Sequence, residues 1–381
     1  NLGLTSGSKN VSTYTNFGYF EQEGILINTD LQRFNFRSNV DGKSDNDKFR
    51  YGTNISVNFS KNNSATNLGT GAINQNYIIG AQQSVPYVSP NQYVNGTQVL
   101  DLYNADGTLV YTPLMLVDKS KTFLNVAEEV KAITSFSASY EIIPGLTLSE
   151  NLGIDYTQVT GLQYQDPAAF NSLIFQQAAG QYLGLDAEYF QRDITFDNTL
   201  SLDYAKTFGL NTISATVYTE YVTSFLKSFG FTQNGLDPKT AFPGDDAGFI
   251  TDVPDNDYYV PTVAANSANV ALLSYFGSVN YDYDGRFGLQ GTLRQDASSR
   301  FTDTNKWGTF YSISGRWNLN RESFMENAGF QLLKLRASYG TTGNQDIQNS
   351  FYGALNRSKE LYITGVGYGG APSYVVGQLA N

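Results

Sequence analysis

The sequence predicts an all-β protein, and more specifically a transmembrane antiparallel up-and-down β-barrel. Three observations predict it: long segments with alternating apolar and polar residues, an alternation of short and long connections, and few charges. Charged residues make up 15% of the 381 residues, well below the roughly 25% of soluble proteins. The net charge of -11 further indicates that the chain binds no nucleic acid.

The alternation is clear near the C-terminal end of the chain. Leu335, Ala337 and Tyr339 share one face of a strand, and Lys334 and Arg336 share the other, because successive strand residues point to opposite faces. In a soluble sandwich the polar face would be solvated. In an outer-membrane barrel the apolar face would meet lipid and the charged face would line a wet lumen. One strand does not separate these two interpretations.

The same pattern recurs along the chain and predicts twelve strands. Several are longer than the 5–6 residues usual in soluble proteins and reach the 9–11 residues that a tilted membrane strand needs. Their length favours the membrane interpretation. We expect strands near residues 12–20, 31–40, 48–60, 132–143, 147–157, 192–205, 210–223, 269–282, 286–295, 308–319, 332–341 and 350–358.

The connections between these strands alternate in length. Short turns, two of them with Pro-Gly or Asp-Gly sequences that form tight turns, alternate with long connections at 61–131, 158–191 and 224–268. A moderately long turn at 320–331 falls on the short side. Outer-membrane barrels have short periplasmic turns and long extracellular loops, so we expect all three long connections at the cell exterior. The short turns are 41–47, 144–146, 206–209 and 283–285.

Composition excludes several kinds of chemistry. The chain has no Cys and no His, which removes Cys nucleophiles, Ser-His-Asp triads, haem, iron–sulfur clusters and His/Cys zinc sites. We therefore expect no enzyme, no catalytic residue and no cofactor. Acidic clusters at 41–47, 245–246 and 252–257 offer oxygen ligands that suit Ca²⁺. None fits an EF-hand loop, and Asp and Asn are common turn formers, so no metal site is predicted.

Two sets of residues are candidates for solute contact. The first is a basic strip on the lumen side, which would touch an acidic plug or an anionic solute, or would instead pair across strands with Asp193, Asp197, Asp203 and Asp296. The second is a set of loop tyrosines that would stack on sugar rings or pack within their loops. The strip is Arg33, Arg37, Arg50, Arg294, Arg316, Lys334 and Arg336, and the tyrosines are Tyr87, Tyr93, Tyr164, Tyr258 and Tyr259.

Three segments carry a resemblance to a known family. Residues 6–39 include Arg33-Phe34-Asn35-Phe36-Arg37, and residues 283–310 include the run from Leu293 to Phe301 followed by Trp307-Gly308. Residues 322–347 include the run from Leu333 to Gly340 followed by the turn Thr342-Gly343-Asn344. In order and spacing these segments resemble the SusC/RagA-type TonB-dependent outer-membrane transporters of Bacteroidota. The long connections between them match no pattern of the family.

The resemblance implies that residues 1–381 are part of a single outer-membrane barrel domain of about 22 strands. A plug domain, a TonB box, a signal peptide and the C-terminal strands are expected to lie outside this sequence. The implied function is TonB-dependent import of a large solute, an oligosaccharide or peptide. The implied partners are a SusD-like surface lipoprotein, TonB acting through the plug, and lipid or lipopolysaccharide. The alternative is a non-transporting accessory or structural barrel subunit of a larger outer-membrane complex.

Overall fold

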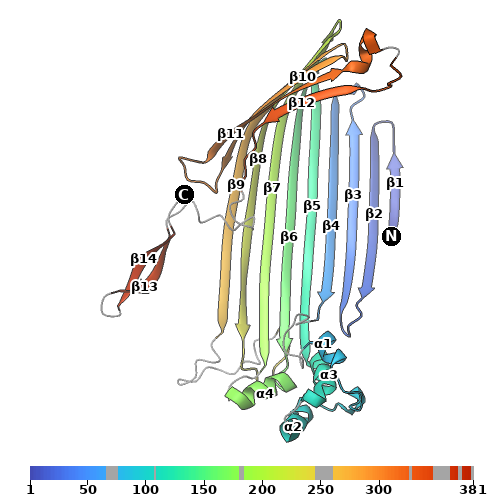
Figure 1. Cartoon of the computed structure of the whole chain (residues 1–381). Coiled ribbons are helices and arrows are strands. Elements are labelled where there is room, and N and C mark those ends of the chain that lie inside the picture. The colour runs from blue at the N-terminus through green and yellow to red at the C-terminus, as the bar shows by residue number, and fades with distance from the viewer. Residues whose placement is uncertain are drawn as a thin grey trace.

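The computed structural model shows one tall, curved antiparallel sheet with a group of helices at one end (Figure 1). It describes residues 1–65, 76–106, 109–179, 184–244, 261–325, 328–345, 361–367 and 371–378. Twelve strands follow one another in chain order, β1 to β12, each paired with the next. Among the described residues β1 and β12 do not pair with each other, so the sheet is an open piece of barrel wall.

The strands share an antiparallel register along most of their length and differ mainly in how far they extend. They are β1 (Leu2–Gly7), β2 (Val11–Glu23), β3 (Asp30–Lys43), β4 (Phe49–Asn63), β5 (Phe123–Ile143), β6 (Leu146–Gln165), β7 (Leu185–Phe208), β8 (Asn211–Gln233), β9 (Thr262–Tyr283), β10 (Phe287–Ser298), β11 (Trp307–Asn318) and β12 (Lys334–Gly340), with a separate hairpin of β13 (Leu361–Val366) and β14 (Pro372–Gln378).

Every predicted strand up to 332–341 coincides with a strand of the sheet, and the predicted fold class is confirmed. The predicted strand at 350–358 lies outside the described residues, and β1 was not predicted. The central strands β5 to β8 are 20–24 residues long and continue well into the segments predicted as loops. In the outer part of β7, for example, Leu185, Ala187 and Tyr189 lie on the face that is polar further along the strand, so the regular pattern is interrupted while the backbone pairing continues.

Short and long connections lie at opposite ends of the sheet, as predicted (Figure 1). Asp284 and Gly285 have φ angles of 54° and 61°, as a two-residue turn with left-handed residues requires. The β11–β12 connection at the short-turn end holds two 3-10 helices, η6 (Leu319–Arg321) and η7 (Ser323–Met325). We call the two ends the short-turn end and the long-loop end.

The two faces of the sheet differ in chemistry and in crowding. Phe17 pairs with Phe36, and Phe36 with Val57, so apolar residues line up across strands. On this face Leu293 is 60% exposed, whereas Ser274 on the opposite face is 0% exposed. Side chains on the concave side of a curved sheet are crowded, so the apolar face is the convex one that meets lipid. The polar face is the inner wall.

The long connections also contain helices, which were not predicted. They are short and carry no long amphipathic repeat, so their hydrophobic pattern is weak. None of the helices in the described residues is both long enough and apolar enough to cross a membrane. The helices are α1 (Tyr77–Gln82), η2 (Pro90–Gln92), α2 (Gly96–Asp106), η3 (Leu109–Tyr111) and α3 (Thr112–Thr122) between β4 and β5, and α4 (Phe170–Ala179) between β6 and β7.

Candidate functional site

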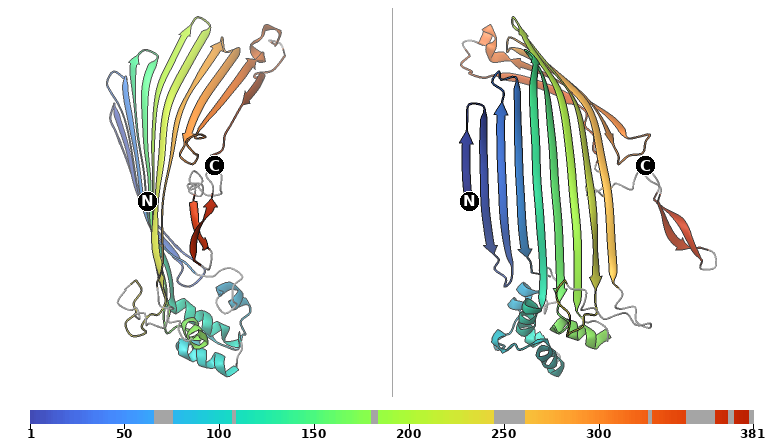
Figure 2. Two further views of the ribbon diagram at one scale, coloured as in Figure 1. Left: turned by 90° about the vertical axis from the view of Figure 1, so that its left-hand side faces the viewer. Right: turned by 180° about the vertical axis from the view of Figure 1, so that it is seen from behind.

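The helices of two long connections pack together into one body, which we call the loop cap (residues 76–122 and 166–179). Its core contains Val99 from α2, Leu114 and Met115 from α3, and Phe170 from α4, all nearly fully buried. Gly96 lies so close to α4 that a Cβ atom there would meet the Ala168 carbonyl oxygen at 2.3 Å. In Figure 2 the cap lies on the side toward which the sheet curves, at the mouth of the inner wall.

One carboxylate joins the two connections of the loop cap. Asp118 on α3 is 2% exposed. Its Oδ2 accepts a hydrogen bond from the backbone N–H of Phe170 at 2.8 Å, and its Oδ1 accepts one from the Tyr93 hydroxyl at 2.9 Å. Burial raises the pKa of Asp118, against the lowering effect of these two bonds. The start of α4 is therefore held by a side chain from a different loop.

The cap is tied to the rest of the long-loop end at further points. The Asn28 side chain, between β2 and β3, donates to the Ser120 carbonyl oxygen at 2.7 Å. Asp186 on β7 accepts from the Gly244 N–H at 3.0 Å, which links the β8–β9 connection to the same end. Burial lowers the pKa of Lys119, which lies over the rings of Tyr77 and Phe123, to about 8.

The five predicted tyrosines are not equivalent. Tyr87 is 72% exposed and is free to meet a solute. Tyr93 is partly buried, and its hydroxyl is bound to Asp118. The placement of Tyr164 in a loop was wrong: it lies in β6 and is 6% exposed, because β6 extends past the expected strand end. Tyr258 and Tyr259 lie outside the described residues.

The predicted basic strip consists of two separate groups on the inner wall. Arg33, Arg37 and Arg50 lie on β3 and β4, whereas Arg294, Arg316, Lys334 and Arg336 lie on β10 to β12. Five strands stand between the two groups. Only the tertiary structure shows this gap, because sequence assigns each residue to a face without giving its neighbours.

The second group contains paired arginines. Arg294 contacts Glu220 on β8 at 2.8 Å and Asp296 at 2.7 Å, and it lies over the Phe276 ring at 4.5 Å. Arg316 pairs with Asp282 on β9. Arg336 lies directly opposite Arg316 in the β11–β12 register. These cross-strand contacts brace the wall where β8 to β11 meet.

The predicted pairing partners were mostly wrong. Asp296 does pair with Arg294, but along the same strand rather than across strands. Asp193, Asp197 and Asp203 all lie on β7, three strands along from Arg50 on β4 and four from Arg33 and Arg37 on β3. Neighbouring strands are about 4.8 Å apart, which places β7 roughly 14 Å from β4, too far for an ion pair.

Two polar arrangements, around Glu322 and around Arg300, had no functional prediction. At the short-turn end Glu322 accepts from Arg286 at 2.6 and 3.1 Å and from the Trp317 indole N–H at 3.0 Å. Both contacts lower the pKa of Glu322, and the contact with Arg286 has the larger effect. Arg300, 2% exposed, donates to the Gln345 carbonyl oxygen at 3.2 Å and so holds the segment after β12 against the β10–β11 connection.

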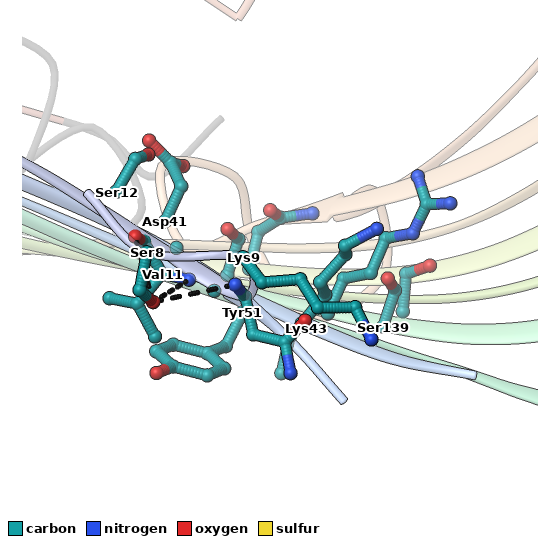
Figure 3. A pocket seen from close by; sticks show the side chains of 16 residues that line it. Ser8, Lys9, Val11, Ser12, Asp41, Lys43, Tyr51 and Ser139 are labelled. Carbon is teal, nitrogen blue, oxygen red and sulfur yellow. Dashed lines mark hydrogen bonds between the residues drawn. The ribbon is translucent and has the colours of Figure 1, made fainter. Parts of the chain in front are cut away.

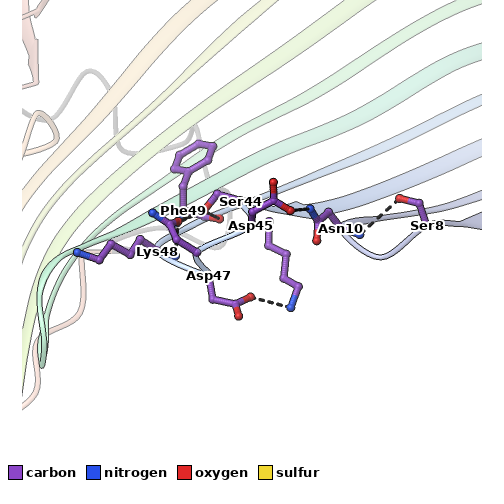
Figure 4. A network of polar contacts seen from close by, with 9 residues as sticks. Ser8, Asn10, Ser44, Asp45, Asp47, Lys48 and Phe49 are labelled. Carbon is purple, nitrogen blue, oxygen red and sulfur yellow. Dashed lines mark hydrogen bonds and ion pairs between the residues drawn. The ribbon is translucent and has the colours of Figure 1, made fainter.

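The acidic cluster at 41–47 forms turn contacts at the short-turn end (Figure 4). The Asn10 side chain donates to Asp45 at 2.5 Å, and Lys43 pairs with Asp47 at 2.6 Å. In the part of the chain that the structure describes, no group of three acidic side chains is arranged to hold a metal ion. The clusters at 245–246 and 252–257 lie outside the described residues.

A depression of about 630 Å³ lies on the wall near this end (Figure 3). Lys9, Lys43 and Arg50 line it together with Ser139. It exists because the wall carries small residues here: Gly52 and the serines of β5 and β6 leave space above the backbone.

Comparisons with known proteins agree with this geometry. No family model matches the chain. TonB-dependent receptor P3 of Formosa agariphila is 30% identical over 374 residues, which are 95% of this chain and 34% of that protein. SusC of Bacteroides thetaiotaomicron is 24% identical over 362 residues, or 92% of this chain and 34% of that protein. The chain thus spans about a third of the length of the curated relatives it matches.

The fold has a close match among solved structures. The RagAB peptide importer in its 'open-open' state superposes with a TM-score of 0.77 at 22% identity, over 100% of this chain and 39% of that one. Long paired strands, an apolar convex face and a polar inner wall define the wall of an outer-membrane β-barrel. Together with the curated relatives, this identifies the chain as a barrel segment of the SusC/RagA-type TonB-dependent outer-membrane receptors.

Proposed function

We propose that the protein to which this wall belongs imports a large solute, an oligosaccharide or a peptide, across the outer membrane in a TonB-dependent cycle. The observation that carries the proposal is the match over almost the whole chain to receptors named TonB-dependent, SusC among them. The fold of the RagAB peptide importer supports it. The relatives are receptors and importers, and the proposal includes no covalent chemistry on the solute.

The work would be divided between the parts of the molecule. The inner wall and the loop cap would bind the solute. A plug pulled by TonB would open the path, driven by the proton gradient of the inner membrane. The convex face would contact lipid and lipopolysaccharide through exposed side chains such as Leu289 and Ile313.

We also propose a SusD-like lipoprotein as a partner, seated on the long-loop end. Loops this long are usually functional, and here they form a packed body rather than separate strands of coil. Asp118 joins the two connections of that body, and Asn28 ties it to the β2–β3 connection. A pre-formed surface costs less conformational entropy to dock against than free loops do.

Uptake and co-purification test both parts of the proposal in the native organism. Labelled oligosaccharide and peptide pools should enter cells only when TonB and the full-length protein are present. A tagged protein should bring a lipoprotein with it from native membranes. Uptake that persists without TonB would contradict the transport cycle, and a barrel isolated without any lipoprotein would favour the accessory-subunit alternative.

A deletion within the β8–β9 connection tests the docking surface. Removing 224–268 would also cut into β8 and β9, which extend to Gln233 and from Thr262. Removing 237–260 spares both strands and keeps Leu236, which is 1% exposed. The barrel should still fold, since loop length affects stability weakly, while lipoprotein association or solute binding should be lost.

A further inference from the structure

The connection between β11 and β12 exposes apolar side chains and buries a carboxylate. Its described part, residues 319–325 and 328–333, which we call the foot, holds η6 and η7, the orange helical turns at the upper right of Figure 1. Three large apolar side chains of the foot are 59–69% exposed: Phe324, Phe330 and Leu332. Glu322, by contrast, is buried. A loop in water usually has the reverse arrangement, with its charges outside.

Polar contacts fix the foot to the sheet. The backbone N–H of Asn320 donates to the Leu333 carbonyl oxygen at 3.2 Å, which closes the connection at its base. Glu322, directly before η7, accepts from Arg286 next to β10 and from the indole N–H of Trp317 on β11. The start of η7 is therefore held toward β10, on the side of β11 away from the open edge of β12.

The side of the sheet to which Glu322 is bound is the convex one. Trp317 shares a face of β11 with Ile313, which is exposed on the convex side. It also stacks on Phe287 with 5.9 Å between ring centroids and lies opposite Leu335 in the register. Directly opposite residues of paired strands point to the same side of a sheet. The lipid-facing surface of β10 to β12 thus continues up to the foot.

Two tryptophans mark the height of the membrane on β11. Trp307 and Trp317 are the only tryptophans of the chain, and they lie on the same face near the two ends of β11. They are about 33 Å apart along the strand at roughly 3.3 Å per residue. A strand tilt of about 40° converts this into about 25 Å across the membrane, the height of the apolar band of such barrels. Tryptophan is enriched at membrane–water interfaces, so Trp317 and the foot bound to it lie at the interface on the short-turn side.

We propose that the foot binds lipid, with Phe324 inserted into the headgroup region of the leaflet at the short-turn end and with Phe330 and Leu332 beside it. In outer-membrane barrels the short turns face the periplasm, so this is the periplasmic leaflet. The partner is lipid because the apolar side chains continue a surface that already faces lipid, at the height of the interface. Insertion removes them from water, as in helices that lie in a membrane interface with their apolar side buried. The proposal is independent of the import function, since it needs only a barrel in a membrane.

Spin labels on the full-length protein in vesicles of phosphatidylethanolamine and phosphatidylglycerol test the foot. A label at Phe324→Cys should collide often with oxygen, which dissolves in lipid, and rarely with a water-soluble nickel chelate. The ratio of the two collision rates should place it about 5–10 Å below the lipid phosphates. Leu289→Cys on the convex face is the lipid reference, and Lys9→Cys, in the β1–β2 turn at the same end, is the water reference. The signal of the unsubstituted protein, labelled in the same way, is subtracted.

A second set of variants tests whether Phe324 anchors the foot. With the label at Leu332→Cys, the change Phe324→Ser should shift the label toward water, because the foot loses its main inserted side chain. Ser323→Ala, at the neighbouring exposed position of η7, should leave the depth of the label unchanged. If a label at position 324 prevents folding, the label at Leu332→Cys alone reports the depth of the foot.

The other outcomes overturn the proposal and assign the surface differently. Frequent collision of the label at Phe324→Cys with both reagents would place this side chain in water. Rare collision with both would mean that it packs against another part of the full-length protein. Exposure to water in vesicles together with protection in native outer membranes would indicate a periplasmic protein partner instead of lipid. TonB-dependent uptake is measured separately, so its failure would leave the foot unaffected.

Discussion

Each residue of a strand faces either lipid or the inner wall, so adjacent positions of β4 should respond very differently to substitution by Arg. Ile55 lies on the lipid-facing side and Asn54 on the inner wall, where its side chain donates to Ser135 at 3.3 Å. Ile55→Arg should cost roughly 2–4 kcal/mol near the bilayer midplane, since a guanidinium would be buried in lipid. Asn54→Arg, in water, should cost much less. A refolding titration in lipid vesicles measures both, and equal costs would mean that the faces of β4 are misassigned.

A second prediction at this scale concerns the Glu322 contacts with Arg286 and Trp317. Because folding lowers the pKa of Glu322, the contacts of its carboxylate stabilise the folded state fully above the unfolded pKa of about 4.3. It is lost as pH falls through the lower folded value. The ¹⁹F resonance of fluorotryptophan at position 317, assigned with Trp317→Phe, should shift in that acid range. Glu322→Gln should remove the pH dependence; a resonance that titrates equally in this variant would contradict the assignment.

At the scale of elements, the loop cap depends on a contact between two loops that sequence places far apart. Asp118→Ala would leave the Phe170 N–H and the Tyr93 hydroxyl as buried donors without their acceptor, at a local cost of about 1–3 kcal/mol. Hydrogen exchange of α4 should rise about 5- to 150-fold, while exchange of β5 and β6 should stay unchanged. Asp101→Ala, at an exposed position of α2, is the matched control. Similar exchange in the two variants would show that α4 is held by its apolar contacts alone.

At the scale of the whole molecule, the position of each connection predicts which side of the membrane it faces. Lys239 in the β8–β9 connection and Lys9 in the β1–β2 turn are both exposed, at opposite ends of the sheet. Trypsin added to intact cells should cleave after Lys239 and spare Lys9, whereas permeabilised cells should be cut at both. Broad-specificity proteases should likewise spare 144–146 and 284–285. Cleavage at Lys9 from outside would reverse the orientation, and Lys239→Gln identifies the external product.

The sequence by itself determined the class of fold, the face of each strand and the end at which the long connections lie. These properties follow from period-2 alternation and from turn residues such as Gly145 and Asp284, which act within a few positions of the chain. For the same reason it assigned Arg33, Arg37 and Arg294 to the inner wall correctly. It could not find the ends of β6 and β7, because in 158–165 and 185–191 the apolar residues no longer keep to one face of the strand.

Only the tertiary structure decided which residues are neighbours. Asp118 meets Phe170 because two loops pack together. Glu220 rather than Asp197 meets Arg294 because strand order and register bring together residues that are 74 positions apart. It also split the basic strip into two groups, one in which Arg294 and Arg316 pair with carboxylates and one in which the described residues supply no ion pair. A face is a local property of one strand, whereas a partner depends on how many strands stand between two side chains and on how they are staggered.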